Sequence, residues 1–460
     1  MTSLWDYVAR EGTSLKGALH GADGSVALTE LETGSCLGLE RESFRGRSVL
    51  LALREQMSTA LALIELDGIA RRLVLCTPDL SAERLAEVSR SAQTDTTLTD
   101  GSVDLSDAHG PIHRLEPRPV PAPIERREAT ASEWILLTSV TTGAPKLVAH
   151  SLASLAGFLP RQPPEPGSVW STFYDIRRYG GLQIYLRAML SGCPLVLSSP
   201  AEATEDFLAR AGAHGVTHIS GTPSHWRRAL MSGAAGRLNP KYVRLSGEVA
   251  DQVVLDQLRA TFPGARVGHA FASTEAGVAF EVDDGLAGFP AEYLNGGARG
   301  VDMKVEDGTL RIRSQRIAGG YLGAASPGLS SEDGYIDTGD LVELQGGRYF
   351  FRGRKGGVIN VGGQKVYPEE IESVLNADPR VRMSLVRARR NPITGAVVVA
   401  DVVLHDHEAT ARTEGASEDI KRELLQACRR ALPAHKVPAM LRLVPTLELT
   451  AAGKLVRPNA

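Results

Sequence analysis

The sequence predicts an α/β protein in which a large N-terminal domain with a β-rich subdomain precedes a small C-terminal α+β domain. Three observations predict this class. Short apolar runs alternate with helical stretches early in the chain, short strands with glycine-rich turns begin near residue 298, and a further change of pattern comes near Gly353. We therefore expect domains at 1–353 and 354–460.

The first elements indicate a layer of parallel strands joined by helices. Strands are predicted at Ser48–Leu53 and Arg72–Cys76, and helices at Glu55–Ile69 and Ser81–Ala92. Strands that alternate with helices of this length are typical of βαβ units. The proline-rich residues 107–130 are predicted to form an extended surface connection.

The α/β pattern then resumes and gives way to a β-rich one. We predict a strand at Trp134–Thr138, a helix at Ala203–Ala213, and strands at Val216–Ser220 and Arg266–His269. Alternating residues at Met303–Ser314 indicate the β-rich subdomain.

The last hundred residues predict a separate α+β unit. A glycine-rich hairpin leads to a helix that starts at Pro368, where the missing N–H costs nothing. Strands follow at Met383–Ala388 and Val397–Leu404, and a helix starts near Ser417. That helix places a row of apolar residues on one face, at Ile420, Leu424, Cys428 and Leu432.

Composition excludes several classes of function. The 460 residues are 43% hydrophobic and 23% charged, with a formal net charge of −3, which favours neither nucleic acid nor an anionic membrane as partner. Neither a secretory signal nor an apolar run of about 20 residues is found. The four widely spaced cysteines indicate reduced thiols in a cytoplasmic protein, and no zinc-ligand spacing occurs. Monomer and homodimer both stay open.

The sharpest local feature is the segment WILLTSVTTGAPKLVAH at 134–150. Short hydroxyl side chains, a glycine and a lysine within one turn supply the donors and the charge that a polyphosphate needs. The order of Gly and Lys differs from that of a P-loop. The candidate phosphate-binding residues are Thr138, Ser139, Thr141, Thr142, Gly143 and Lys146.

This segment resembles the Thr-Ser-Gly-Thr-Thr-Gly-x-Pro-Lys loop of the adenylate-forming superfamily of AMP-binding enzymes. That superfamily includes acyl- and aryl-CoA synthetases, adenylation domains of peptide synthetases and beetle luciferases. HISGTPSHWRRAL at 218–230 is similar to the family's segment beside the acyl pocket. Ser246, Gly247 and Glu248 resemble the turn against adenine. In HAFASTEAG, the resemblance implies that Thr274 contacts phosphate and Glu275 helps to hold Mg²⁺.

Later motifs follow in the family's order. The resemblance implies that Asp340 binds the ribose hydroxyls and that Arg354 meets ribose or phosphates. It also implies that Lys454 bridges the carboxylate and the α-phosphate, that Gly363 lines a pantetheine tunnel, and that the small domain is mobile about a hinge at Gly356.

The resemblance implies an AMP-forming acyl- or aryl-CoA ligase, which makes an acyl adenylate from a carboxylic acid and transfers the acyl group to the thiol of coenzyme A. ATP, Mg²⁺ and coenzyme A are the implied cofactors. The implied catalytic residues are Lys454, Glu275, Thr274 and Thr141, with Glu275 as the metal ligand. The implied cofactor-binding residues are Thr138, Ser139, Thr142, Gly143, Lys146, Ser246, Gly247, Glu248, Phe271, Asp340, Arg354 and Gly363.

Two alternatives stay open. The enzyme could instead load the phosphopantetheine arm of an acyl carrier protein. The second alternative is a non-catalytic acyl- or nucleotide-binding homologue, because Val140 replaces the first glycine of the loop and Gly356 replaces a charged hinge residue.

The acyl pocket is expected to include Tyr174, Arg178, Tyr179, Gly181, Ala270 and Ala272. Tyr174, Arg178 and Tyr179 favour an aromatic or polar acid of medium size. The alternative is that Arg177 and Arg178 face solvent and carry no information about the substrate.

Overall fold

The structure is a computed structural model. It describes residues 3–9, 15–101, 105, 110–123, 129–138, 145–160, 162–163, 165–296, 300–323, 329–391, 395–405, 416–450 and 454–456. The predicted phosphate-binding residues Ser139, Thr141, Thr142 and Gly143, and also Val140, lie outside the described residues.

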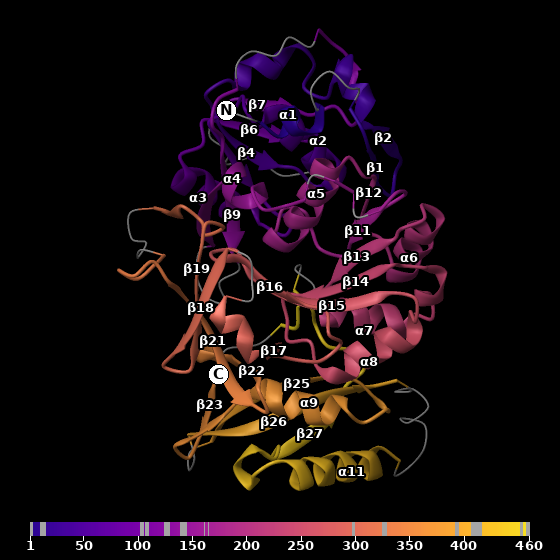
Figure 1. The fold of residues 1–460 in the computed structure, drawn as a ribbon, viewed down its shortest axis with the longest axis vertical. Helices are drawn as coiled ribbons and strands as arrows, with labels where there is room; N and C mark the ends of the chain where they lie inside the picture. The colour runs from indigo at the N-terminus through magenta and orange to yellow at the C-terminus, as the bar shows by residue number, and fades with distance from the viewer. Residues whose placement is uncertain are drawn as a thin grey trace.

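The predicted N-terminal strands form a mixed sheet with a parallel centre, as expected (Figure 1). In the order of the sheet its strands are β20 Gly320–Leu322, β10 Lys146–Ser151, β9 Glu133–Thr138, β5 Arg72–Leu75, β4 Ser48–Ala52, β6 Thr96–Thr99 and β7 Ile112–Arg114. Part of the proline-rich segment is therefore a strand, since β7 pairs with β6. The rest includes β8 Val120–Pro121, which pairs with β3 Gly34–Ser35.

A second sheet carries the middle of the chain. Its order is β16 Gly277–Val282, β15 Arg266–Ser273, β14 Tyr242–Ser246, β13 His218–Gly221, β11 Trp170–Thr172, β12 Leu195–Leu197, β1 Ala18–His20 and β2 Ser25–Ala27. The strands from β15 to β1 run parallel, and β16 returns antiparallel to β15. The carboxyl ends of β11, β13, β14 and β15 therefore meet at one edge.

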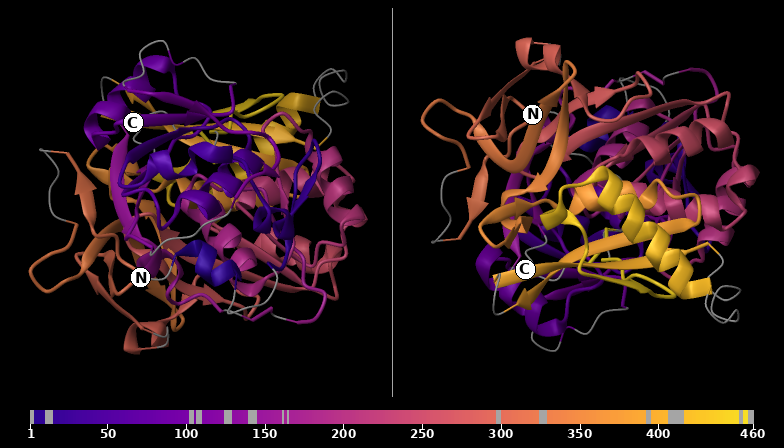
Figure 2. Two further views of the ribbon diagram at one scale, coloured as in Figure 1. Left: turned by 90° about the horizontal axis from the view of Figure 1, so that it is seen from above. Right: turned by 90° about the horizontal axis from the view of Figure 1, so that it is seen from below.

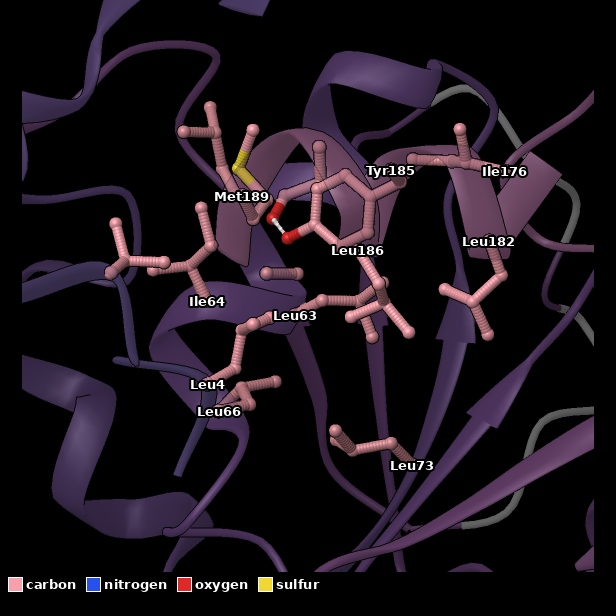
Figure 3. Close-up of a cluster of buried hydrophobic side chains, with 14 of the residues drawn as sticks. Leu4, Leu63, Ile64, Leu66, Leu73, Ile176, Leu182, Tyr185, Leu186 and Met189 are labelled. Carbon is pink, nitrogen blue, oxygen red and sulfur yellow. Dashed lines mark hydrogen bonds between the residues drawn. The ribbon is translucent and has the colours of Figure 1, made fainter. Parts of the chain in front are cut away.

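A helical layer between the two sheets forms the largest core. The described helices of residues 1–261 are α1 Leu4–Ala9, α2 Gln56–Leu66, α3 Ala82–Ala92, α4 Leu152–Ala156, α5 Tyr179–Ser191, α6 Thr204–Ala213, α7 Pro223–Met231 and α8 Gln252–Thr261. Residues of α1, α2, α4 and α5 belong to this core. Leucines of α2 and α5 lie near Leu73 of the first sheet (Figure 3). Leu195 of the second sheet belongs to the same buried cluster. The Tyr185 hydroxyl donates to the Ala60 carbonyl at 2.8 Å, which satisfies the polar end of a fully buried ring.

The β-rich subdomain predicted from residue 298 is present as a separate antiparallel sheet. Its order is β17 Phe289–Pro290, β22 Arg348–Arg354, β21 Ile336–Gln345, β19 Thr309–Ser314 and β18 Val301–Glu306. Its own cluster of buried residues includes Phe280, which belongs to β16, so this sheet is packed against the end of the second sheet.

The C-terminal unit has the predicted α+β order. It comprises the hairpin β23 Ile359–Val361 and β24 Gln364–Val366, helix α9 Pro368–Asn376, strands β25 Val381–Asn391 and β26 Gly395–Leu404, helix α11 Ala416–Ala431, and strand β27 Met440–Leu443. Figure 2 shows α11 lying across this small sheet. Leu424 and Cys428 of α11 are buried there, as the four-residue spacing predicted. Among the described residues, none of the helices has both the length and the apolar character needed to cross a bilayer.

The start of α5 is built on a buried ion pair. Arg177 is 1% exposed, pairs with Asp175 at 2.6 Å, and donates to the carbonyl oxygens of Leu53 and Arg54. The alternative in which Arg177 faces solvent is therefore wrong. Arg178 begins α5 and forms an ion pair with Asp79 at 3.2 Å.

We predict that Gly181→Ala lowers the free energy of unfolding by about 1–3 kcal/mol, as overpacking does. A methyl group at Gly181 would collide with the backbone carbonyl of Asp175. The control is Gly180→Ala in the same helical turn, where the new methyl would lie an ordinary 3.6 Å from the Tyr174 ring. Urea unfolding measures both, and equal effects of the two alanines would contradict the predicted contact.

Candidate functional site

Several candidate residues lie where parallel strands of the second sheet end. Thr222 follows β13, Ser246 ends β14, and Thr274 follows β15, so neighbouring strands deliver them to one edge. Ligands of open α/β sheets bind at this carboxyl edge. Thr222 also caps α7, because its hydroxyl accepts from the His225 N–H at 3.0 Å and Pro223 fills the first helical position.

The turn after β14 fastens the C-terminal tail to the large domain. One carboxylate oxygen of Glu248 accepts from the Ser224 N–H at 2.9 Å, and the other accepts from the Leu455 N–H at 3.1 Å. Gly247 has a φ of +87°, and a methyl group there would lie 3.3 Å from Cε of Lys454. In Figure 1 the yellow C-terminal segment accordingly reaches up from the small domain to this edge.

Lys454 lies among charged groups from both domains. Desolvation lowers its pKa, Glu248 and Asp340 raise it, and Arg354 and Arg178 lower it further. These groups are therefore close enough to act on one ammonium group. Asp340 pairs with Arg354 at 3.1 Å across β21 and β22. The structure thus brings together five of the predicted site residues, Lys454, Glu248, Asp340, Arg354 and Arg178.

The turn between β15 and β16 carries Thr274 and Glu275 and is braced from two sides. Nε2–H of His150 donates to the Thr274 carbonyl at 2.8 Å. The Tyr321 hydroxyl donates to Glu275 at 3.2 Å, and the Lys146 ammonium lies 5.1 Å from the centre of the Tyr321 ring. Lys146 is paired with Thr138 at the end of the β9–β10 hairpin, and these two residues are the described ends of the predicted phosphate loop. Through Tyr321, this end of the hairpin lies near Glu275.

The donor set fits one magnesium ion that is shared with phosphate. Glu275 is a half-buried carboxylate at the turn, and it also acts on the pKa of Arg354. In the described part of the chain, no three metal-ligating side chains gather. Mg²⁺ is commonly held by one or two carboxylates together with substrate phosphates, so a single Glu275 is compatible with it.

The remaining predicted residues have distinct positions. Phe271 stacks on Phe351 with ring centres 5.0 Å apart, which joins β15 to the β-rich subdomain. Gly363 lies at the turn of the β23–β24 hairpin with a φ of +86°, and its N–H donates to Asn360 at 2.9 Å. Gly356 lies in a short exposed helical turn, and a methyl group there would meet no atom within 4 Å.

A cavity of about 240 Å³ lies between α4, α5 and β16. Of the six residues predicted for the acyl pocket, Tyr179 lines it. Tyr174 is instead buried with its hydroxyl donating to the Ser246 carbonyl at 2.8 Å, and Gly181 packs on the Asp175 carbonyl. Arg178, Ala270 and Ala272 are likewise not among the lining residues. These five residues lie outside this cavity, and their assignment to the acyl pocket stays a prediction.

The residues that sequence reasoning missed come from distant parts of the chain. The cavity wall includes Phe158, Gln183, Arg187, Glu281 and Arg316. Gln183 and Arg187 follow Tyr179 by four and eight residues, the spacing of one helical face, so that signal was available.

Two protein-family models together match most of the chain. The model described as AMP-binding enzyme matches residues 47–331, and the model described as AMP-binding enzyme C-terminal domain matches residues 370–454.

Individual relatives are distant. The 2-succinylbenzoate–CoA ligase of Salmonella typhimurium is 30% identical over 258 residues, which cover 54% of this chain and 53% of the relative. The chain thus spans about half the length of that ligase. A protein of Salinispora arenicola named as a nonribosomal peptide synthetase is 27% identical over 427 residues, or 83% of this chain and 5% of the relative. The o-succinylbenzoate coenzyme A synthetase from Bacillus subtilis, solved with ATP and magnesium ion, has the same fold, with a TM-score of 0.77, 22% identity and 98% coverage of each chain.

We predict that His150 makes stability depend on pH between about 4 and 6.5. Burial lowers the pKa of His150 to about 4. Between that value and the unfolded pKa of about 6.5, the unfolded chain binds a proton that the folded chain does not. The free energy of unfolding therefore falls as pH drops through this range, by up to about 3 kcal/mol from this residue.

Urea unfolding of the wild type and of His150→Gln at pH 7.5 and pH 5 measures the effect. Glutamine keeps a donor for the Thr274 carbonyl and does not titrate, so the variant is expected to lose less stability at pH 5 than the wild type does. The exposed His405, changed to glutamine, is the control. An equal loss in wild type and His150→Gln would contradict the assignment.

Proposed function

Because the chain belongs to the AMP-binding enzyme family, we propose that it activates a carboxylic acid with ATP as an acyl adenylate and then transfers the acyl group to the thiol of coenzyme A. The observation that carries this proposal is the position of Lys454. It comes from the small domain, lies on Gly247 at the carboxyl edge of the large sheet, and shares its surroundings with Asp340 and Arg354.

The first half-reaction brings two anions together. A carboxylate oxygen attacks the α-phosphorus of ATP, and pyrophosphate leaves with the electrons of the broken P–O bond. Positive charge placed where negative charge develops is the main means of lowering such a barrier. In the proposal Lys454 bridges the carboxylate and the α-phosphate, Lys146 and Thr274 contact phosphate, and Arg354 with Asp340 holds the ribose end.

Magnesium would be held by Glu275 together with phosphate oxygens, and when bound it would neutralise part of the triphosphate charge. The residues of the chain keep that carboxylate in place. Tyr321 donates to Glu275, and His150 fixes the carbonyl of the residue before it. Both contacts hold the turn in a fixed geometry before any ligand arrives, which supports a role in positioning.

The second half-reaction requires the thiol to attack the acyl carbonyl, with loss of the thiol proton and departure of AMP. We propose that residues 354–460 then swing about Gly356, which removes Lys454 and brings Gly363 to the acyl site. The open space around Gly356 supports this hinge. This movement would break the hydrogen bond from the Leu455 N–H to the Glu248 carboxylate.

A second acceptor fits the same chemistry. A carrier-protein phosphopantetheine offers the same thiol as coenzyme A, and the likeness to part of a Salinispora peptide synthetase favours that alternative. Incubation with ATP, the acid and either coenzyme A or a phosphopantetheinylated carrier protein, followed by mass spectrometry of the products, distinguishes the two. A cytoplasmic location is proposed with either acceptor, because the four cysteines are buried free thiols.

A non-catalytic homologue would bind acid or nucleotide without releasing pyrophosphate. The position of Lys454 at the carboxyl edge, beside Glu248, Asp340 and Arg354, supports the catalytic proposal. ATP-dependent release of pyrophosphate in the presence of a suitable acid tests this alternative directly.

We predict that Lys454→Ala lowers the rate of ATP–pyrophosphate exchange by about 10²–10³-fold, the usual effect of removing one group that stabilises transition-state charge. The reverse thioester half-reaction, starting from acyl-CoA and AMP, is expected to lose less, because Lys454 serves adenylation. The control is Lys421→Ala on α11, a surface lysine paired with Glu418 in the same domain. Equal loss in both half-reactions would contradict the domain swing, and unchanged exchange would contradict the role of Lys454.

A further inference from the structure

The small domain rests on the large domain through a contact between β25 and α7. Figure 1 shows β25 directly below α7. Helix α7 follows Thr222 at the carboxyl edge of the second sheet. In the proposed reaction cycle this contact exists while Lys454 lies at that edge, and the swing of residues 354–460 would break it. Charges at the contact therefore act on the balance between the two domain arrangements.

Arg382 lies in a β-bulge at the start of β25. Val381 pairs with Leu404 and Met383 pairs with Val403, so Arg382 is an extra residue on its strand. A bulge of this kind re-aims a side chain relative to the regular alternation of the strand. Val381 is accordingly buried in the core of the small domain, whereas its neighbour Arg382 is only half-buried.

The charge that acts on Arg382 belongs to a second arginine. Arg228 lies in the last turn of α7 and is exposed. Burial and the charge of Arg228 both lower the pKa of Arg382, and among the described residues no carboxylate opposes them. Two guanidinium groups, one from each domain, are therefore close enough to repel each other. We call Arg228 and Arg382 the arginine pair.

The arginines beside this pair have partners of their own. On α7, Arg227 forms an ion pair with Asp251. Before β25, Arg380 forms one with Asp378 at 2.7 Å. In the part of the chain that the structure describes, neither member of the arginine pair has such a partner. The repulsion is therefore not compensated by a neighbouring carboxylate.

We propose that the arginine pair repels across the domain interface and thereby favours release of the small domain from the arrangement that serves adenylation. This inference rests on the proposed function, because it assumes the domain movement between the two half-reactions. Charge pairs near the surface change such a balance by about two- to tenfold. A repulsion of this size permits docking for the first half-reaction and helps the domain to leave for the second.

Hydrogen exchange of the Leu455 amide reports docking in the full chain without any substrate. The Leu455 N–H donates to Glu248 of the large domain at 3.1 Å, and this bond exists only while the tail is docked. Exchange through an opening equilibrium slows in proportion to the population of the closed form. Mass spectrometry with fragmentation of the C-terminal peptide measures the rate at this amide.

Charge reversal tests the sign of the interaction. Arg228→Glu and Arg382→Glu each replace repulsion by attraction, so each is expected to slow exchange of the Leu455 amide by about two- to tenfold. The double variant restores like charges and is expected to return to within about twofold of the wild-type rate. The control is Arg422→Glu on α11, a position that is 72% exposed, which makes the same change of charge and should leave the rate unchanged.

Salt provides a second test of the same interaction. Between about 0.1 M and 1 M salt the screening length falls from about 10 Å to about 3 Å. The difference in Leu455 exchange rate between the wild type and each single reversal is therefore expected to shrink over this range. A difference that does not change with salt would contradict an electrostatic origin.

The outcomes distinguish this inference from the function on which it rests. An unchanged exchange rate in both single reversals would overturn the arginine pair as a source of repulsion. Exchange that stays slow in the double variant would also overturn it, because the loss of arginine and not the sign of the charge would then be responsible. If no acid supports ATP–pyrophosphate exchange while the Leu455 rate still follows the charges, the repulsion stands and the proposed function is overturned.

Discussion

The contact on which the site depends is the docking of the C-terminal tail on the turn after β14. Glu248 accepts one backbone N–H from the start of α7 and one from Leu455, so a single carboxylate fastens both domains. The positive φ of Gly247 and its missing side chain let Lys454 lie against the turn. Without this close approach the lysine would be one more solvated surface charge at the end of a chain.

The β15–β16 hairpin joins the Thr274–Glu275 turn to the wall of the cavity. Its turn carries Thr274 and Glu275, and its second strand forms one wall of the cavity that ends at Glu281. His150 and Tyr321 brace the turn, while Arg187 and Arg244 hold the other end. A paired strand keeps its length, so this hairpin holds the Thr274–Glu275 turn at a fixed distance from Glu281.

The likeness to solved structures at 22% identity shows the fold alone. The charges around Glu281 are specific observations on this chain, and they arise where α5, β14 and β16 meet. Function is thus carried by a site placed on a common scaffold.

The sequence by itself determined the order of elements and the family. Strands such as β4 and β5, helix α11, and the β-rich subdomain were predicted because hydrophobic periodicity, glycine and proline act locally. Motif residues such as Asp340, Arg354 and Lys454 were predicted because each lies in a short recognisable segment.

Tertiary structure decided which residues line the cavity. Arg187 and Glu281 are 94 residues apart in the sequence, and His150 and Thr274 are 124 residues apart, so no local sequence pattern predicts these contacts. Tyr174 and Gly181 were predicted for the acyl pocket from their segment alone, and only the folded chain shows that the Tyr174 hydroxyl donates to the Ser246 carbonyl and that Gly181 packs against the Asp175 carbonyl. Which way a side chain faces depends on neighbours that only the folded chain brings together.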